Sequence, residues 1–217
     1  MSNKTIVYYT ANQEDERFER LIVERLTQAA GDIPIISVSH RPMDLGTNIC
    51  VGEKAVHDVN LLRQIQIGVE AAQTPFILAA ESDCLYPPEY FTFYPPTEDC
   101  YRYTNLWILH TWVGRVTKGL FWRKRYSDCA QIAGRDFWLR KLEVSLAGHP
   151  EWVQLGDSQP RVTHQTKTAF YWEGKNPVIN IKTGHGLRKY TGTMRGVAPA
   201  AELPYWGSAA DLRKALS

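Results

Sequence analysis

The sequence predicts an α/β protein in which helices flank a mixed, mainly parallel sheet within a single domain, residues 1–217. Two apolar runs, Lys4–Thr10 and Ile33–Ser39, are rich in β-branched residues and are typical of buried strands. Between them an apolar stripe at helical spacing predicts an amphipathic helix. The stripe consists of Phe18, Ile22, Leu26 and Ala29. A helix that joins two buried strands indicates a right-handed crossover within a parallel sheet.

Later segments supply further elements. The sequence predicts a loop over His40–Gly52, followed by a helix at about Glu53–Gln73. Cys100–His110 is expected to form one strand, antiparallel beside the central strand. The other predicted elements are a helix over Gly134–Ala147, strands at Thr168–Trp172 and Pro177–Ile181, and a helix at Ser208–Leu216.

Length and composition indicate a globular protein without a membrane partner. The 217 residues are 44% hydrophobic and contain no repeat or long block of like charge, so one large core is expected. MSNKTIVYYT lacks the apolar region of a secretory signal, and no run approaches the roughly 18 apolar residues of a membrane span. The cysteines stand far apart without a CxxC pair, which argues against a zinc ribbon or a disulfide framework. These features predict reduced thiols in a cytoplasm.

The charges are unevenly distributed. Residues 1–114 contain 8 Lys/Arg against 15 Asp/Glu, whereas residues 115–217 contain 17 against 8. The basic second half could form a face that binds phosphates. Alternatively, the two halves neutralise one another across the fold.

A third apolar run, Phe76–Ala80, ends in Glu81-Ser82-Asp83. This pattern predicts a buried central strand with two carboxylates at its carboxyl end, the edge of an open α/β sheet where ligands bind. Carboxylates two residues apart can both turn toward one hard divalent cation. The alternative is a strand end that reaches solvent.

The helix Asn60–Ala72, this strand, the acid-x-acid triplet and the loop Tyr86-Pro87-Pro88 resemble the centre of the nucleotide-sugar glycosyltransferases with the GT-A fold. The resemblance covers roughly the first half of the chain. It implies a GT-A-like, Rossmann-like domain with a donor half, 1–105, and an acceptor half, 106–217. It further implies a UDP-linked sugar donor and a divalent metal, Mn²⁺ or Mg²⁺, held against the donor diphosphate by Asp83 and Glu81. Glu81 stands where the family has Asp, which keeps the negative charge but lengthens the side chain.

The same resemblance implies a set of donor-binding residues in the loops after the first strands. Thr10, Asn12, Ser37 and Ser39 would bond the base or ribose, whereas Gly46 and Asn48 would let backbone approach the diphosphate. Each of these residues also suits ordinary turn chemistry. The remaining members of the predicted donor set are Arg63, Ser82 and Arg188.

The resemblance also implies functional roles for two residues in the second half of the chain. Several GT-A families take a third metal ligand from a C-terminal histidine, and His185, flanked by glycines, fits that position. The family also places an acceptor-side acid at the start of a helix, which makes Asp136 the candidate base for the attacking hydroxyl. The alternatives are a surface histidine and a carboxylate that stabilises the helix dipole.

Aromatic and basic residues interleave between Trp112 and Tyr126, which suits stacking on bases and neutralising phosphates. The predicted acceptor-binding residues are Trp112, Trp122, Arg123, Lys124 and Arg125. Alternatively, this segment is a hairpin whose rings face the core. A hydroxymethylated pyrimidine in DNA is the specific acceptor to test, in a protein of phage type acting in the host cytoplasm. A nucleotidyltransferase and a non-catalytic nucleic-acid-binding domain are the other functions that the sequence leaves open.

Overall fold

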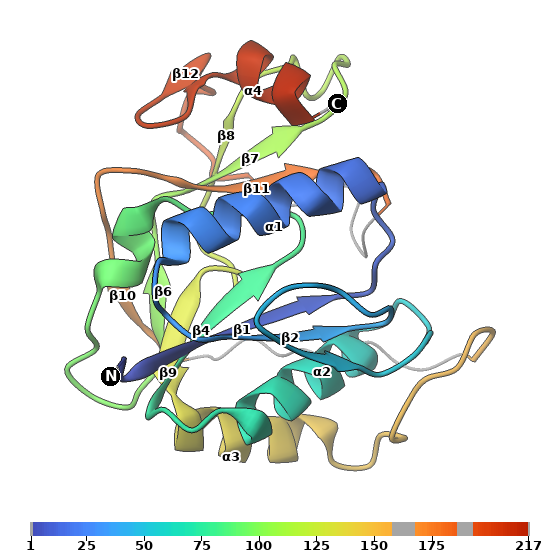
Figure 1. Ribbon diagram of the computed structural model, residues 1–217. Coiled ribbons are helices and arrows are strands. Elements are labelled where there is room, and N and C mark those ends of the chain that lie inside the picture. Colours follow the sequence, from blue (N-terminus) through green and yellow to red (C-terminus); the bar gives the residue numbers. More distant parts are fainter. Residues whose placement is uncertain (1, 158–167, 186–192, 217) are drawn as a thin grey trace.

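The computed structural model describes residues 2–157, 168–185 and 193–216 (Figure 1). Its main sheet has seven strands in the described ranges, in the order β10-β6-β9-β4-β1-β2-β3. All run parallel except β9, which is antiparallel to both of its neighbours. The strands are β1 (Lys4–Thr10), β2 (Ile35–Ser39), β3 (Thr47–Cys50), β4 (Phe76–Glu81), β6 (Tyr101–Tyr103), β9 (Gln131–Gly134) and β10 (Phe170–Trp172).

A second sheet of four strands, in the order β5-β11-β7-β8, is built mainly from the second half of the chain. Its strands are β5 (Cys84–Leu85), β7 (Leu106–His110), β8 (Trp122–Lys124) and β11 (Val178–Lys182). A small hairpin pairs β12 (Glu202–Leu203) with β13 (Gly207–Ser208), and η1 (Pro88–Thr92) is a 3₁₀ helix. The α-helices are α1 (Glu16–Ala30), α2 (Asp58–Ala71), α3 (Arg135–Leu146) and α4 (Ala209–Leu216).

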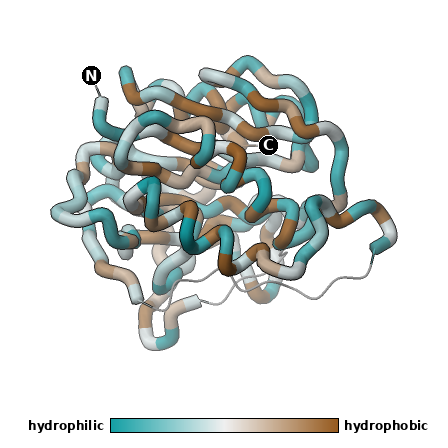
Figure 2. The backbone as a smooth tube through the Cα atoms, turned by 90° about the horizontal axis from the view of Figure 1, so that it is seen from below, coloured by the Kyte–Doolittle hydropathy of each residue, from teal (hydrophilic) through white to brown (hydrophobic). Residues whose placement is uncertain are grey.

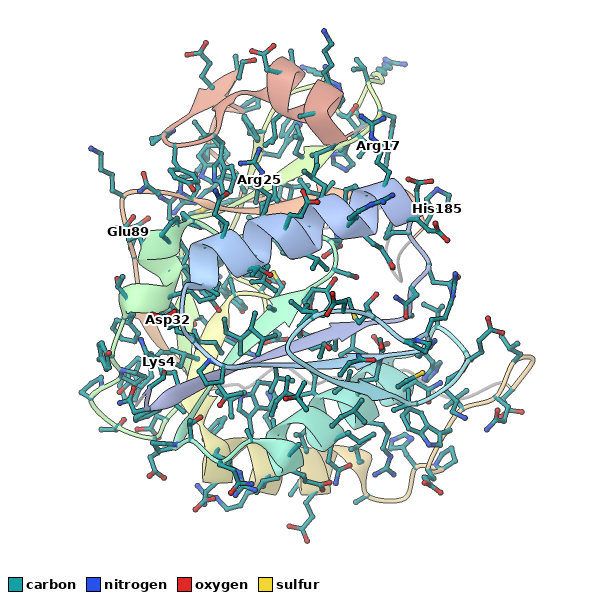
Figure 3. All side chains as sticks on the ribbon, in the orientation of Figure 1. Lys4, Arg17, Arg25, Asp32, Glu89 and His185 are labelled. Carbon is teal, nitrogen blue, oxygen red and sulfur yellow. The ribbon has the colours of Figure 1, made fainter. Side chains whose placement is uncertain are left out.

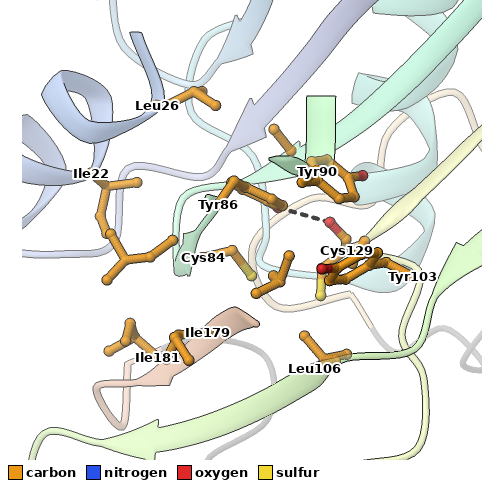
Figure 4. Packing of buried hydrophobic residues seen from close by; sticks show 14 of the residues in the cluster. Ile22, Leu26, Cys84, Tyr86, Tyr90, Tyr103, Leu106, Cys129, Ile179 and Ile181 are labelled. Atoms are coloured by element: carbon orange, nitrogen blue, oxygen red, sulfur yellow. Dashed lines mark hydrogen bonds between the residues drawn. The ribbon is translucent and has the colours of Figure 1, made fainter. Parts of the chain in front are cut away.

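Helices cover both faces of the main sheet. In Figure 1, α2 and α3 lie on one face, and α1 lies on the other, between the main sheet and the second sheet. The alternation of side chains along β1 explains this layering. Ile6 and Tyr8 belong to the apolar cluster on the α1 side, and Val7 and Tyr9 belong to the cluster under α2 and α3. Figure 4 shows the α1-side cluster, and Figure 2 shows apolar and polar positions interleaved along the chain on the α2 and α3 side.

Local signals in the sequence account for how two helices begin and pack. Asp15 caps α1, because its side chain accepts hydrogen bonds from the backbone N–H groups of Arg17 and Phe18. In α2, Gly68 faces β1, where an added Cβ would lie 2.4 Å from Val7 Cγ1. This glycine therefore permits the close approach of α2 to the sheet.

The predicted fold class is confirmed, with three local corrections. The predicted loop over 40–52 contains β3, a short edge strand parallel to β2. The predicted strand Cys100–His110 breaks at Thr104 into β6 and β7, which belong to different sheets, and the antiparallel neighbour of β4 is β9. The helix α2 begins at Asp58, five residues later than expected, because His57 caps it by accepting the N–H of Val59.

The chain order creates a crevice at one edge of the main sheet. From β1 the chain passes through α1 to β2 on one side, whereas β3 leads through α2 to β4 on the other side of β1. At such a point the connections diverge and leave a crevice at the carboxyl ends of the strands. Among the described residues, no helix has the length and hydropathy needed to traverse a bilayer.

Candidate active site

A pocket lies at the carboxyl ends of β1 and β4, where the connections diverge. It is open to solvent. The second sheet contributes residues of β8 and β11, and α2 contributes its N-terminal turns. The lining side chains include Tyr9, Thr10, Glu14, His40, His57, Asn60, Gln64, Glu81, Ser82, Asp83, Lys124, Asn180 and Lys182.

The carboxylate of Asp83 is held by groups from β11. Lys182 Nζ donates to Asp83 Oδ2 over 2.8 Å, and Asn180 Nδ2 donates to Oδ1 over 2.9 Å. The N–H of Ile181 also donates to the Asp83 carbonyl over 2.6 Å. The thiol of Cys84 completes the set with a 3.4 Å contact to Oδ1. Both carboxylate oxygens of Asp83 are therefore engaged.

The carboxylate of Glu81 lies beside a tyrosine of the neighbouring strand. Tyr9 pairs with Glu81 in the β1–β4 register, and its hydroxyl donates to Glu81 Oε1 over 2.8 Å. The Tyr86 hydroxyl accepts from the N–H of Glu81 and donates to the carbonyl of Cys129 (Figure 4). Tyr86 therefore ties the end of β4 to the segment that leads into β9.

The two carboxyl groups have opposite pKa shifts. Burial, with the nearby Cys129 and Asp83, raises the pKa of Glu81 to about 8, so Glu81 is protonated at neutral pH. Burial also acts to raise the pKa of Asp83, but the charge and hydrogen bond of Lys182 outweigh it and hold that pKa below its usual value. For Lys182, burial acts to lower the pKa, and Asp83 outweighs it and raises that pKa. The acid-x-acid triplet therefore carries one negative charge, paired with an ammonium group.

A hard divalent cation does not fit this arrangement. It would have to displace Lys182, whose Nζ lies 2.8 Å from Asp83 Oδ2. An ammonium group left at about 4 Å would repel each unit of the cation's charge by roughly 4 kcal/mol in a protein environment. The geometry of Asp83 and Glu81 thus departs from the metal site that the family resemblance implies.

The described residues do contain one possible metal-binding cluster of another composition. Ligand atoms of Glu81, Cys84 and Cys129 lie within 4.8 Å of one another. Thiolates prefer softer ions than Mg²⁺ or Mn²⁺. Both thiols are fully buried in the apolar cluster on the α1 side. Burial keeps the pKa of Cys84 well above its usual value, whereas the hydrogen bond with Cys84 lowers the pKa of Cys129 to about 7.

The predicted donor residues divide between the pocket and its supporting loops. Thr10 and Ser82 line the pocket. Asn12 joins the loops after β1 and β2, because its side chain accepts from Arg41 N and donates to Glu19. Arg188 lies outside the described residues.

The other predicted donor residues serve the local structure. Asn48 donates to the hydroxyls of Ser37 and Ser39, which in turn donate to backbone carbonyls of the β2–β3 connection. Gly46 has φ of 57°, and an added Cβ would lie 2.2 Å from the Ile35 carbonyl oxygen. Arg63 donates to the carbonyls of His149 and Pro150. The structure brings none of these five residues into the pocket lining.

The predicted base Asp136 lies at the opposite edge of the main sheet, which corrects its assignment. In the antiparallel β4–β9 pair, Gly134 is the partner of Phe76, the first residue of β4. Asp136 follows directly in α3 and is exposed. Because β4 runs five further residues to Glu81, the two acids stand roughly 16 Å apart along the strand direction.

The predicted third metal ligand, His185, is exposed at the edge of the sheet where α1 begins (Figure 3). Its backbone N–H donates to the Thr183 hydroxyl, which donates to Glu14. Its ring is not among the ligand groups that cluster within 4.8 Å in the described residues. Its predicted metal role therefore stays a prediction.

The predicted acceptor residues face different directions. Lys124 lines the pocket, and its Nζ donates to the Ser127 hydroxyl over 2.9 Å. Arg123, on the other face of β8, pairs with Glu173 and Asn105. The other three are half-buried or at the surface: Trp122 donates to the Thr117 carbonyl, Trp112 contacts His110, and Arg125 lies over Tyr126.

Sequence reasoning missed several pocket residues. Lys182, Asn180, Glu14, His40 and Gln64 line the pocket, but no motif marks them. Alternation along β11 puts Asn180 and Lys182 on one face of the strand, and this was the available signal. It could not identify Asp83 as their partner, because Lys182 and Asp83 are 99 residues apart.

The chain matches no protein-family model and no curated protein sequence. Among solved structures it is similar to the bifunctional IspDF from Campylobacter jejuni, with 9% identity and a TM-score of 0.44 over 81% of this chain. The match spans half of that enzyme's length, 50%. A glycosyltransferase involved in glycosylation of the major capsid of PBCV-1 matches with 10% identity and a TM-score of 0.46, over 82% of this chain and 92% of that one. HddC from Yersinia pseudotuberculosis matches with 10% identity and a TM-score of 0.45, over 81% and 92%. At this distance these likenesses assign neither a family nor a function to the chain.

Proposed function

We propose that the protein is a transferase that moves a glycosyl group from a nucleoside-diphosphate donor to a hydroxyl acceptor. The pocket at the carboxyl ends of β1 and β4 carries this proposal, because it places Asp83 and two lysines in one open cavity at that edge of the sheet. That position, outside the carboxyl ends of the strands where the connections diverge, suits a nucleotide-linked substrate. The pocket draws on both halves of the chain, so we propose one domain in which donor and acceptor residues are interleaved.

Unpartnered polar atoms in the lining support a polar ligand. His40 Nε2 and Asn180 Oδ1 are buried and have no hydrogen-bond partner among the described residues. Buried polar atoms are nearly always bonded in native proteins, so a bound ligand is a fitting partner. We place the nucleoside toward His40 and the start of α2, and the sugar toward Asn180.

The attacking hydroxyl needs a base, and Glu14 replaces Asp136 in this role. Glu14 lines the pocket and accepts a hydrogen bond from the Thr183 hydroxyl over 2.8 Å. Burial raises its pKa, which brings a carboxylate closer to the pKa that suits general base catalysis near neutral pH.

The acceptor is proposed to be a soluble hydroxyl compound. A hydroxymethylated pyrimidine in DNA stays a prediction, because Arg123 is paired with Glu173 and does not join Lys124 in one basic face. UDP as the nucleotide also stays a prediction. The assay below compares Mn²⁺, Mg²⁺ and EDTA, because the residues around Asp83 do not fit the metal that the family resemblance implies.

The test is hydrolysis and transfer with a panel of nucleotide sugars, each with Mn²⁺, with Mg²⁺ and with EDTA. Release of a nucleoside diphosphate that increases on adding an acceptor, including hydroxymethylated DNA, would support glycosyl transfer. Release of pyrophosphate from a nucleoside triphosphate and a sugar phosphate would instead show a nucleotidyltransferase. Glu14→Gln should lower transfer at least tenfold, whereas Glu16→Gln, on the exposed first turn of α1, should not.

A further inference from the structure

The positive charge beside Asp83 is an ammonium group of the chain itself. Lys182 ends β11, and its Nζ lies 2.8 Å from Asp83 Oδ2. A diphosphate carries two or more negative charges, and a pocket binds it only where positive charge offsets them. Building on the function proposed above, we propose that Lys182 supplies this charge to the donor diphosphate, in the place of a divalent cation.

The strand that carries Lys182 fixes its position. β11 lies between β5 and β7, and the N–H of Ile181 donates to the carbonyl of Asp83 over 2.6 Å. Asn180, two residues earlier on the same face, donates to Asp83 Oδ1. The ammonium group is therefore placed before any ligand arrives, which reduces the ordering that binding requires.

The pocket leaves the ammonium group accessible to an anion. The side chains of Lys182 and Asp83 are 12% and 20% exposed, and both line the pocket. An ammonium group has three N–H donors, and Asp83 takes one of those of Lys182 in the described contacts. Lys124, from β8, brings a second positive charge to the same pocket.

This arrangement gives Asp83 a different role from a metal ligand. Asp83 positions Lys182, and its own negative charge opposes that of an incoming diphosphate. Removing that charge while keeping the side-chain shape should therefore preserve or tighten diphosphate binding. If Asp83 were a metal ligand, the same substitution would weaken binding, because the cation that bridges the two would be lost.

The experiment measures the binding of UDP, of other nucleoside diphosphates and of inorganic pyrophosphate by calorimetry, in EDTA and in Mn²⁺. We expect the unmodified protein to bind a diphosphate in EDTA. Lys182→Met should raise Kd at least about tenfold, the loss expected for one charge-assisted contact, and Lys182→Arg should recover much of it. Asp83→Asn should bind as tightly as the unmodified protein or more tightly. Lys214→Met, on exposed α4, is the matched control and should not change Kd.

Lys182→Met leaves Asp83 without its ammonium partner, which could disturb folding. The double variant Asp83→Asn, Lys182→Met removes both charges and so measures the loss of the ammonium group without an unpaired carboxylate. It should fold and bind a diphosphate more weakly than the unmodified protein, but no more weakly than Lys182→Met, because the opposing charge of Asp83 is also absent. Binding that appears only with Mn²⁺ and disappears in Asp83→Asn would overturn the role of Lys182 and leave the proposed glycosyl transfer intact. Lys182-dependent binding in EDTA without any sugar transfer would instead refute the proposed function alone. Absence of diphosphate binding under every condition would refute both.

Discussion

Two ion pairs of almost equal length occupy different environments in this protein. Arg102 and Asp128 lie 2.7 Å apart with side chains 2% and 8% exposed, and Arg102 also packs over the ring of Tyr126. Lys182 and Asp83 lie 2.8 Å apart with side chains 12% and 20% exposed, in the wall of the pocket. The first pair joins β6 to the segment before β9, closed from solvent. The second pair lines a pocket that a ligand can enter, as the proposed diphosphate site requires. The distance between two charges therefore does not distinguish the pairs, whereas their access to a cavity does.

The largest expected effect comes from breaking the enclosed pair. Arg102→Met leaves Asp128 as a buried charge without its guanidinium, which typically costs about 3–5 kcal/mol of unfolding free energy. Urea denaturation followed by fluorescence would measure the loss. The double variant Arg102→Met, Asp128→Leu should recover part of it, since no charge is then buried. If Arg102→Met is as stable as the unmodified protein, the pair does not hold β6 in place.

Measuring the unfolding free energy at several pH values tests the protonation of Glu81, which lies beside the accessible pair Lys182 and Asp83. Because the pKa of Glu81 is raised to about 8 from 4.5, the folded state holds a proton that the unfolded state releases, so this contribution to stability is lost as pH rises from about 4.5 to 8. Glu81→Gln removes that dependence. As pH rises through this range, we expect the unfolding free energy of the variant to increase by between about 1 and 4 kcal/mol relative to that of the unmodified protein.

The difference in unfolding free energy between the unmodified protein and Glu81→Gln, taken at each pH, removes the contribution of the histidines, because both proteins contain them. Burial lowers the pKa of His40 and His110, which makes stability rise with pH below about 6.5 in both proteins. The depressed pKa of Asp83 acts only at more acid pH. A stability difference that does not change between pH 5 and pH 8 would show that Glu81 is ionised in the folded protein.

Breaking the accessible pair should cost less stability than breaking the enclosed one. Lys182→Met leaves Asp83 partly solvated and still bonded to Asn180, so we expect a loss of about 1–2 kcal/mol. The same urea titration measures it, with Lys214→Met as the control. A loss equal to that of Arg102→Met would mean that Lys182 has a structural role like that of Arg102.

The smallest effect is expected at Asp136, on the edge of the sheet away from the pocket. Its side chain is 67% exposed, and its contact with Arg135 is 4.0 Å. Asp136→Asn should cost no more than about 0.5 kcal/mol, a surface helix-dipole contribution, and should leave transfer within twofold of the unmodified protein. A tenfold loss of transfer with unchanged stability would restore Asp136 as a catalytic candidate.

The sequence by itself determined the elements and one end of the pocket. Apolar runs predicted β1, β2 and β4, periodicity predicted α1 and α3, and the abrupt end of an apolar run put Glu81 and Asp83 at the carboxyl edge of the central strand. These features are local, because the spacing of apolar residues along a few turns or a few strand positions specifies them. The fold class followed from the order of these elements.

The tertiary structure alone decided which residues meet at that edge. Asp136 was the predicted base for the attacking hydroxyl, but β9 pairs antiparallel with β4, and this direction carries Asp136 to the opposite end of the strands. Lys182 carries no motif, yet the pairing of β11 with β5 brings it to Asp83. Strand direction and register depend on packing between segments many residues apart, which no local pattern encodes. For that reason the sequence indicated a metal beside Asp83, and the folded chain places an ammonium group there.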